Sequence, residues 1–173
     1  KMVAPKWKVT DGYFEAAPGS GDLISREKFG DAQYHVEWCE PESIKGESQD
    51  RGNSGFIIMS RYEIQVLDSF GLVPSMGDCG AIYDQTRPRV NASLPPERWQ
   101  TYDITFRAPR LNPDGSVAEK ARVTVDLNGV RVQDNVAIEG ATAGHAPGKP
   151  PVNAATGGGE EIVGRVIPGH AGN

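Results

Sequence analysis

Short segments in which apolar and polar side chains alternate constrain the fold of this 173-residue chain more than any other feature. Residues 33–39 (QYHVEWC) and 99–107 (WQTYDITFR) both show this two-residue period, which is typical of a strand with one apolar face. Glycine and proline supply 34 residues, about a fifth of the chain, and no stretch of 12 residues keeps a helical period. The pattern predicts an all-β fold of two antiparallel sheets packed face to face, a sandwich or jelly roll.

Turn signals separate these segments. Asp11-Gly12 and Asn128-Gly129 each lie between apolar runs and predict hairpins, and residues 53–68 have room for two strands with a tight turn. Residues 70–98 and 140–159 are rich in glycine, proline and asparagine, so we expect loops there. The length fits a single domain covering residues 1–173.

Composition excludes several classes of partner. The net charge is −5, and no cluster of five or more lysines and arginines occurs, so we expect no nucleic-acid partner. The longest apolar runs are far shorter than the roughly 18 residues of a membrane span. The sequence begins directly before strand-like residues, and removal of an upstream export segment stays open.

The few cysteines and histidines predict no metal site. Cys39 and Cys79 are either one disulfide bridge or two separate thiols, and both readings stay open. His35, His145 and His170 form no zinc-binding pattern. We expect no cofactor, although a divalent cation is compatible with the sequence.

The densest group of polar residues runs from Asn53 through Arg61, Glu63 and Gln65 to Asp68. Strand alternation puts Glu63 and Gln65 on one face and Tyr62, Ile64 and Val66 on the other. A shared sheet face with Glu37 would supply two carboxylates for acid–base chemistry on a glycosidic bond. The alternative is that Glu63 and Gln65 are the solvated face of an ordinary strand.

Seven sequence blocks in a fixed order resemble the 3-keto-disaccharide hydrolase domain family, over roughly residues 7–140. They are Glu37-Trp38, RGNSG (51–55), RYEIQVLDS (61–69), GAIY (80–83), VNAS (90–93), WQTYDI (99–104) and VTVDLNGVRVQDN (123–135). The resemblance implies a concanavalin A-like jelly-roll sandwich and a bacterial protein that is exported to the periplasm or the cell surface. Family members usually extend beyond both ends of this sequence, so the sandwich would lack terminal edge strands.

The resemblance also implies a carbohydrate substrate, namely a glycoside oxidised at C3. It suggests Glu63 and Gln65 as the sugar site, with Asn53, Arg61, Asp68, Tyr83 and Glu37 as the other motif positions. We expect Glu63 to act as base or acid, Arg61 to pair with an enolate or carboxylate, and Gln65 and Asn53 to bind hydroxyl groups.

His170, in the segment PGHAGN, is a candidate second acid or base, and an ordinary turn histidine is its alternative. Direct hydrolysis by two carboxylates is the rival mechanism. A noncatalytic, lectin-like carbohydrate-binding module is the alternative function, and a structural domain of a larger assembly is a third. The sequence leaves the oligomeric state open.

Overall fold

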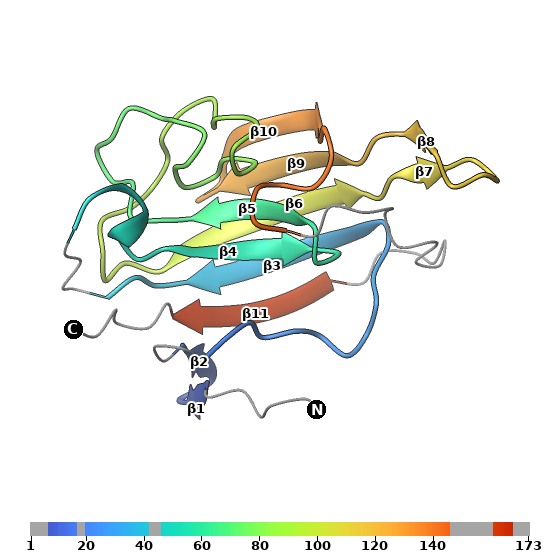
Figure 1. Cartoon of the computed structure of the whole chain (residues 1–173). Helices are drawn as coiled ribbons and strands as arrows, with labels where there is room; N and C mark the ends of the chain where they lie inside the picture. The colour runs from blue at the N-terminus through green and yellow to red at the C-terminus, as the bar shows by residue number, and fades with distance from the viewer. Residues whose placement is uncertain (1–6, 17–19, 42–45, 146–160, 168–173) are drawn as a thin grey trace.

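The computed structural model describes residues 7–16, 20–41, 46–145 and 161–167, which form strands and one short 3-10 helix, η1 (Ser48–Asp50) (Figure 1). The strands are β1 (Lys8–Thr10), β2 (Tyr13–Glu15), β3 (Ala32–Trp38), β4 (Ser54–Ile58), β5 (Tyr62–Val66), β6 (Gln100–Arg107), β7 (Arg110–Leu111), β8 (Val117–Glu119), β9 (Arg122–Leu127), β10 (Val130–Ala137) and β11 (Glu161–Ile167). Within the described residues the protein is all-β, as the sequence predicts.

The large sheet has the strand order β1-β2-β11-β3-β6-β9-β10. All its pairs are antiparallel except those of β11, which runs parallel to both β2 and β3. The prediction of two antiparallel sheets therefore holds for the fold class, and the large sheet departs from it by this one mixed strand. Two parallel strands of one sheet cannot be joined by a tight turn, so a strand that runs parallel to its neighbours requires a long connection. The segment between residues 137 and 161 is the connection that leads from β10 to β11.

Both predicted hairpin turns are present. Asp11 and Gly12 have φ angles of 45° and 83°, and Asn128 and Gly129 have φ angles of 52° and 79°. Positive φ at both central residues is the geometry of a type I′ turn, whose twist matches that of the flanking strands. These turns join β1 to β2 and β9 to β10.

The strands β4 and β5 form the second layer, which lies in front of β3 and β6 in Figure 1. Aromatic pairs connect the layers, with ring centroids 5.2 Å apart for Tyr34 and Phe56 and 5.7 Å apart for Tyr62 and Phe106. The hydroxyl of Tyr102, on β6, donates a hydrogen bond across the core to the Gln65 carbonyl (2.5 Å). The predicted two-layer packing is confirmed.

A loop-rich segment extends the second layer. Residues 70–98, predicted to be loops, contain no named strand, but Ile82 forms isolated bridges with Ile64 and Thr86. The Tyr83 N–H donates to the Glu63 carbonyl (3.1 Å), and the Gln65 N–H donates to the Ala81 carbonyl (3.0 Å). This segment therefore covers the edge of β5 that β4 leaves open.

The short hairpin of β7 and β8 has no signal in the predicted pattern, because its strands are two and three residues long. Cys39 and Cys79 are both free thiols, so the structure favours two separate thiols over a disulfide bridge.

Among the described residues, no helix has the length and apolar character that a membrane span requires.

Candidate functional site

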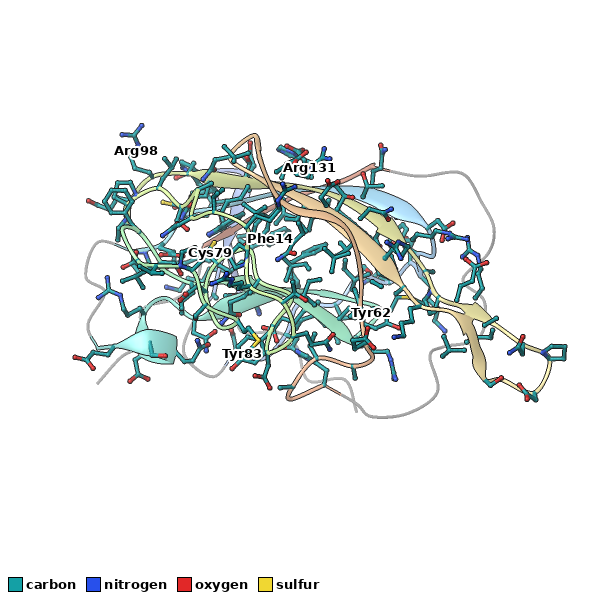
Figure 2. The ribbon with its side chains drawn as sticks, turned by 90° about the horizontal axis from the view of Figure 1, so that it is seen from above. Phe14, Tyr62, Cys79, Tyr83, Arg98 and Arg131 are labelled. Atoms are coloured by element: carbon teal, nitrogen blue, oxygen red, sulfur yellow. The ribbon has the colours of Figure 1, made fainter. Side chains whose placement is uncertain are left out.

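The outer face of β5 carries the candidate site. Tyr62, Ile64 and Val66 are buried in the core between the layers, so Glu63 and Gln65 project from the opposite face, as strand alternation predicts. Loops from three parts of the chain approach this face, at residues 48–53, 75–78 and 142–145. Figure 2 shows Tyr83 on the side where β4 and β5 lie, and Arg131 on the opposite side of the molecule.

A carboxylate and an imidazole meet at the centre of this face. Glu63 Oε2 lies 2.8 Å from His145 Nε2, and the two side chains are only 13% and 20% exposed. A half-buried pair of this kind can exchange a proton with a ligand, because carboxylates and imidazoles are the usual acids and bases of enzymes. The partner of Glu63 is therefore a histidine rather than the second acid that the sequence analysis considered.

Gly55, on β4, gives the Glu63 side chain its place. A Cβ atom added at position 55 would lie 2.1 Å from Glu63 Oε1 and 2.8 Å from its Cδ, so the carboxylate lies directly over the Gly55 backbone. Any side chain at position 55 would push it away. Because Gly55 has no side chain, the Glu63 carboxylate of the neighbouring strand can pack directly against the β4 backbone.

Amide side chains continue the site beyond Glu63. Gln65 is 1% exposed, and its Nε2 donates to Gln49 Oε1 (2.7 Å), Asn53 Oδ1 (3.4 Å) and the Gly77 carbonyl (3.4 Å). These three acceptors fix the orientation of the amide. The amide oxygen of Gln65, Oε1, is buried and has no hydrogen-bond partner among the described residues. This atom, beside Asn53, can therefore accept a further hydrogen bond.

A strap, defined as residues 138–145, brings His145 to β5. Thr142 Oγ1 accepts a hydrogen bond from the Glu63 N–H (3.0 Å), and the Thr142 N–H donates to the Arg61 carbonyl (3.0 Å). The side chain of Gln85 accepts from the Glu139 N–H (2.9 Å) and donates to the carbonyls of residues 140 and 141 (3.3 Å each). The Thr142 bonds therefore hold the strap against the β4–β5 hairpin, and the Gln85 bonds hold it against the loop that covers the edge of β5.

Asp68, a predicted sugar-binding residue, lies inside the protein. It is 1% exposed, forms an ion pair with Arg51, and accepts a hydrogen bond from the Phe70 N–H (3.2 Å). Glu40 is buried nearby, and burial, followed by the negative charge of Asp68, raises the pKa of the Glu40 carboxyl to about 8. Asp68 therefore anchors the loop that carries Gln49 and Asn53 instead of facing a ligand.

Glu37 does not share the sheet face of Glu63. It lies on β3 in the large sheet, and its neighbours Val36 and Trp38 fill the core, so Glu37 points away from the second layer. Its carboxylate is 3.7 Å from His35 Nε2, and His35 Nδ1 is 2.6 Å from Asp103. The hydrogen bond to Asp103 raises the pKa of His35. The expected two-carboxylate arrangement is therefore absent, because β3 and β5 belong to different layers.

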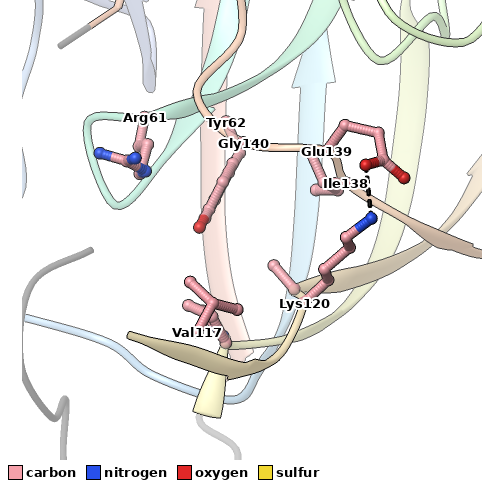
Figure 3. Close-up of a pocket in the computed structure, with 9 residues that line it drawn as sticks. Arg61, Tyr62, Val117, Lys120, Ile138, Glu139 and Gly140 are labelled. Atoms are coloured by element: carbon pink, nitrogen blue, oxygen red, sulfur yellow. Dashed lines mark hydrogen bonds and ion pairs between the residues drawn. The ribbon is translucent and has the colours of Figure 1, made fainter. Parts of the chain in front are cut away.

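The remaining predicted residues fall at the borders of the site or outside the described residues. Asn53 is exposed beside Gln65. Arg61, in the turn before β5, lines a pocket together with Tyr62 (Figure 3). Tyr83 is held next to Glu63 by a hydrogen bond from its backbone N–H to the Glu63 carbonyl. His170 falls outside the described residues. No group of three or more histidine, cysteine, aspartate or glutamate side chains in the described part of the chain is arranged to hold a metal ion.

Two residues of the candidate site were not predicted from the sequence. His145 lies 82 positions from Glu63 in a glycine-rich segment, and Gln49 lies in a loop without periodicity. Neither has a local pattern that would point to β5. The sequence analysis predicts only a loop for the region of His145, from residue 140 onward.

The candidate site thus combines a carboxylate–imidazole pair with amide side chains on one face of an all-β sandwich. The chain belongs to the 3-keto-alpha-glucoside-1,2-lyase-like domain family, whose sequence pattern matches residues 1–159. It is also similar to a "putative glycosyl hydrolase" from Parabacteroides distasonis ATCC 8503, with 40% identity and a TM-score of 0.77.

That similarity covers 84% of this chain and 62% of the other, so the chain spans less than two thirds of its structural neighbour. Comparison with curated proteins gave no match.

Proposed function

We propose that the protein cleaves 3-keto-glycosides at the Glu63–His145 pair. The observation that carries the proposal is the 2.8 Å contact between these side chains, half-buried on a sheet face that also holds Gln65 and Asn53. Membership of a 3-keto-glucoside lyase-like family supports the choice of substrate. A ketone at C3 of the sugar acidifies the C2 proton, which makes base catalysis the natural chemistry.

The proposed reaction begins when the Glu63–His145 pair removes the C2 proton and the C–H electron pair forms an enolate with the C3 oxygen. In this proposal Arg61 is the cationic partner that stabilises the enolate oxygen. The enolate then expels the aglycone oxygen from C1, and that oxygen takes up a proton. Addition of water to the resulting enone at C1 and C2 gives net hydrolysis.

The amides supply proposed contacts to sugar hydroxyls. Gln65 Oε1 has no partner among the described residues, and Asn53 lies at the exposed side of the same cluster. Because Gln65 Oε1 is buried, a water that bridges to a sugar hydroxyl is its proposed partner, whereas the exposed Asn53 can contact a hydroxyl directly. We therefore assign Gln65 and Asn53 to binding rather than to proton transfer.

The test is to incubate the protein with a 3-keto-disaccharide and to measure released 3-keto-glucose by chromatography. We expect turnover by the wild type, and a loss of about 10²–10⁴-fold in kcat for both Glu63→Gln and His145→Gln. Glu119→Gln is the matched control, since Glu119 lies on β8 in an exposed ion pair with Arg107.

Each outcome separates the proposed enzyme from a lectin-like module. Binding without turnover by the correctly folded wild type would favour the module, and retention of that binding by Glu63→Gln would strengthen this reading. Equal turnover by the wild type and Glu63→Gln would show that the reaction uses another site.

A further inference from the structure

The last residues of the strap form a turn that places His145 over β5. The Thr142 carbonyl accepts a hydrogen bond from the His145 N–H (3.2 Å), which closes a β-turn. Gly144 is the third residue of this turn, and its φ angle of 80° is the value that a type II turn requires there. Ala143 and Gly144 are both exposed, so the turn is held at Thr142 rather than by packing around its tip.

Thr142 takes the place of a strand neighbour for Glu63. The Glu63 carbonyl accepts from the Tyr83 N–H (3.1 Å), and the N–H of a strand residue points to the same side as its carbonyl. In a regular sheet, a hydrogen-bonded residue of the next strand would serve both groups. Here the Glu63 N–H donates to Thr142 Oγ1 (3.0 Å), and this hydroxyl donates to the Arg61 carbonyl (3.2 Å).

The start of the strap has its own attachment. The side chain of Gln85 binds the backbone of residues 139–141 through three hydrogen bonds, none of which involves Thr142. Thr142 is 1% exposed, and its N–H donates to the Arg61 carbonyl (3.0 Å). Loss of the Thr142 hydroxyl should therefore leave the start of the strap in place and loosen the turn that carries His145.

The contacts of Thr142 and His145 form a closed path that begins and ends on Glu63. The Glu63 N–H binds the Thr142 hydroxyl, the Thr142 carbonyl binds the His145 N–H, and His145 Nε2 lies 2.8 Å from the Glu63 carboxylate. The backbone of β5 thus sets the distance between the carboxylate and the imidazole. Such placement matters for catalysis, since a displacement of about 1 Å can cost roughly 10²-fold in rate.

We propose that Thr142 is the positioning residue for His145, and that its hydroxyl holds the imidazole at the Glu63 carboxylate by binding the Glu63 N–H. The consequence for turnover rests on the proposed function, whereas the consequence for the position of His145 does not. Thr142 acts through His145 and is assigned no contact with the substrate.

The first experiment measures turnover of a 3-keto-disaccharide by Thr142→Val and Thr142→Ser. Valine keeps the shape of threonine without its hydroxyl, whereas serine keeps the hydroxyl. We expect kcat to fall about 10–100-fold in Thr142→Val and to stay within about threefold of wild type in Thr142→Ser. KM should change by less than about threefold, because Gln49 and the Gly77 carbonyl, rather than the strap, hold the Gln65 amide.

Thr124→Val is the matched control. Thr124 Oγ1, on β9 in the large sheet, also accepts a hydrogen bond from a backbone N–H, that of Asn135 (2.9 Å). Valine removes the same kind of bond there, so it should lower the free energy of unfolding and leave kcat unchanged. An equal kcat in Thr142→Val and Thr124→Val, or a loss in Thr142→Ser as large as in Thr142→Val, would overturn the proposal.

The second experiment requires no turnover. Diethyl pyrocarbonate acylates accessible, uncharged imidazole nitrogens, and mass spectrometry of peptides separates His145 from the other histidines. The His145 side chain is 20% exposed in its contact with Glu63, so its release in Thr142→Val should speed its acylation several-fold. Thr142→Ser and Thr124→Val should react at the wild-type rate.

Gly144→Ala tests the same turn should Thr142→Val fold poorly. A Cβ atom at position 144 would meet no atom within 4 Å, so this change acts only through the φ angle of 80°. It should also speed the acylation of His145. Unchanged acylation in both Thr142→Val and Gly144→Ala would overturn the positioning role. An absence of turnover by the folded wild type would instead end the proposed function, and the acylation rates alone would then decide the role of Thr142.

Discussion

At the scale of single residues, the Glu63 carboxylate lies between the backbone of Gly55 and the imidazole of His145. The glycine supplies space and the histidine supplies a partner, and neither is a neighbour of Glu63 in sequence. The position of the carboxylate thus depends on contacts that a substitution can remove one at a time.

Replacement of Gly55 by alanine should displace the Glu63 side chain without unfolding the protein. The added Cβ would overlap the carboxylate, but a side chain with three rotatable bonds can move aside. We expect a loss of unfolding free energy below about 1 kcal/mol, less than the ~1–3 kcal/mol typical of overpacked cores. A crystal structure of the variant should show the Glu63–His145 contact broken.

A double-mutant cycle provides the control. In a Glu63→Ala background the overlapping atoms are gone, so Gly55→Ala should leave stability nearly unchanged. A cost as large in that background as in the wild type would mean that position 55 is constrained by something other than Glu63.

Alternation alone predicts which side chains of β5 face out, because the two-residue period of a strand is a local property. The sequence therefore suffices to pair Glu63 with Gln65 and to bury Ile64. It cannot assign Glu37, since the layer to which a strand belongs depends on the path of the whole chain. The same limit applies to Asp68, whose burial depends on Arg51 in a loop.

At the scale of elements, a buried charge cluster anchors the loop of residues 46–53 to the end of β5. Asp68 pairs with Arg51 through side chains, and the Asp68 N–H donates to the Arg51 carbonyl (2.9 Å). Glu40 is 1% exposed and close enough to Asp68 for their charges to interact. The Arg51 guanidinium thus lies near two acids, and the raised pKa of Glu40, about 8, keeps Glu40 mostly protonated at neutral pH.

The wild-type protein should lose stability as the pH rises to alkaline values, and the Glu40→Gln variant should not show this loss. The ordinary pKa of this carboxyl is 4.5, and in the folded state burial and Asp68 raise it to about 8. A raised pKa means that the folded state binds the proton more tightly, so stability is full below pH 4.5 and falls as pH rises through 8. The loss is roughly 3–5 kcal/mol of unfolding free energy as an upper bound.

The measurement is denaturant unfolding of wild type and Glu40→Gln between pH 5 and pH 9, with Glu97→Gln, an exposed acid, as control. The difference between wild type and Glu40→Gln should grow as the pH rises. Parallel curves for these two proteins would show that Glu40 is ionised in the folded state at neutral pH.

At the scale of the whole molecule, the all-β class and two hairpins follow from local patterns, whereas the arrangement of the layers does not. Turn residues such as Asn128-Gly129 carry their geometry with them. The place of β11 between β2 and β3, and the approach of His145 to Glu63, depend on long connections whose course no short pattern encodes.

The two thiols provide a readout of whole-molecule stability, because they differ in depth. Cys79 lies in the core at 2% exposure, its Sγ is 3.2 Å from the Tyr102 hydroxyl, and burial raises its pKa to about 11. Cys39 is only partly buried, and burial together with the charges of Glu40 and Glu97 raises its pKa. Since thiolates react and thiols do not, a thiol reagent at pH 8 should label Cys39 first.

Labelling of Cys79 should require the two layers to separate, and should be at least about 10³-fold slower than in denaturant, as expected for global unfolding of a stable domain. A Cys79→Ala variant should keep the fast phase and lose the slow one. Fast labelling of both thiols in the folded protein would mean that the layers open locally around Tyr102. Labelling of neither thiol in denaturant, until a reductant is added, would mean instead that Cys39 and Cys79 form a disulfide bridge.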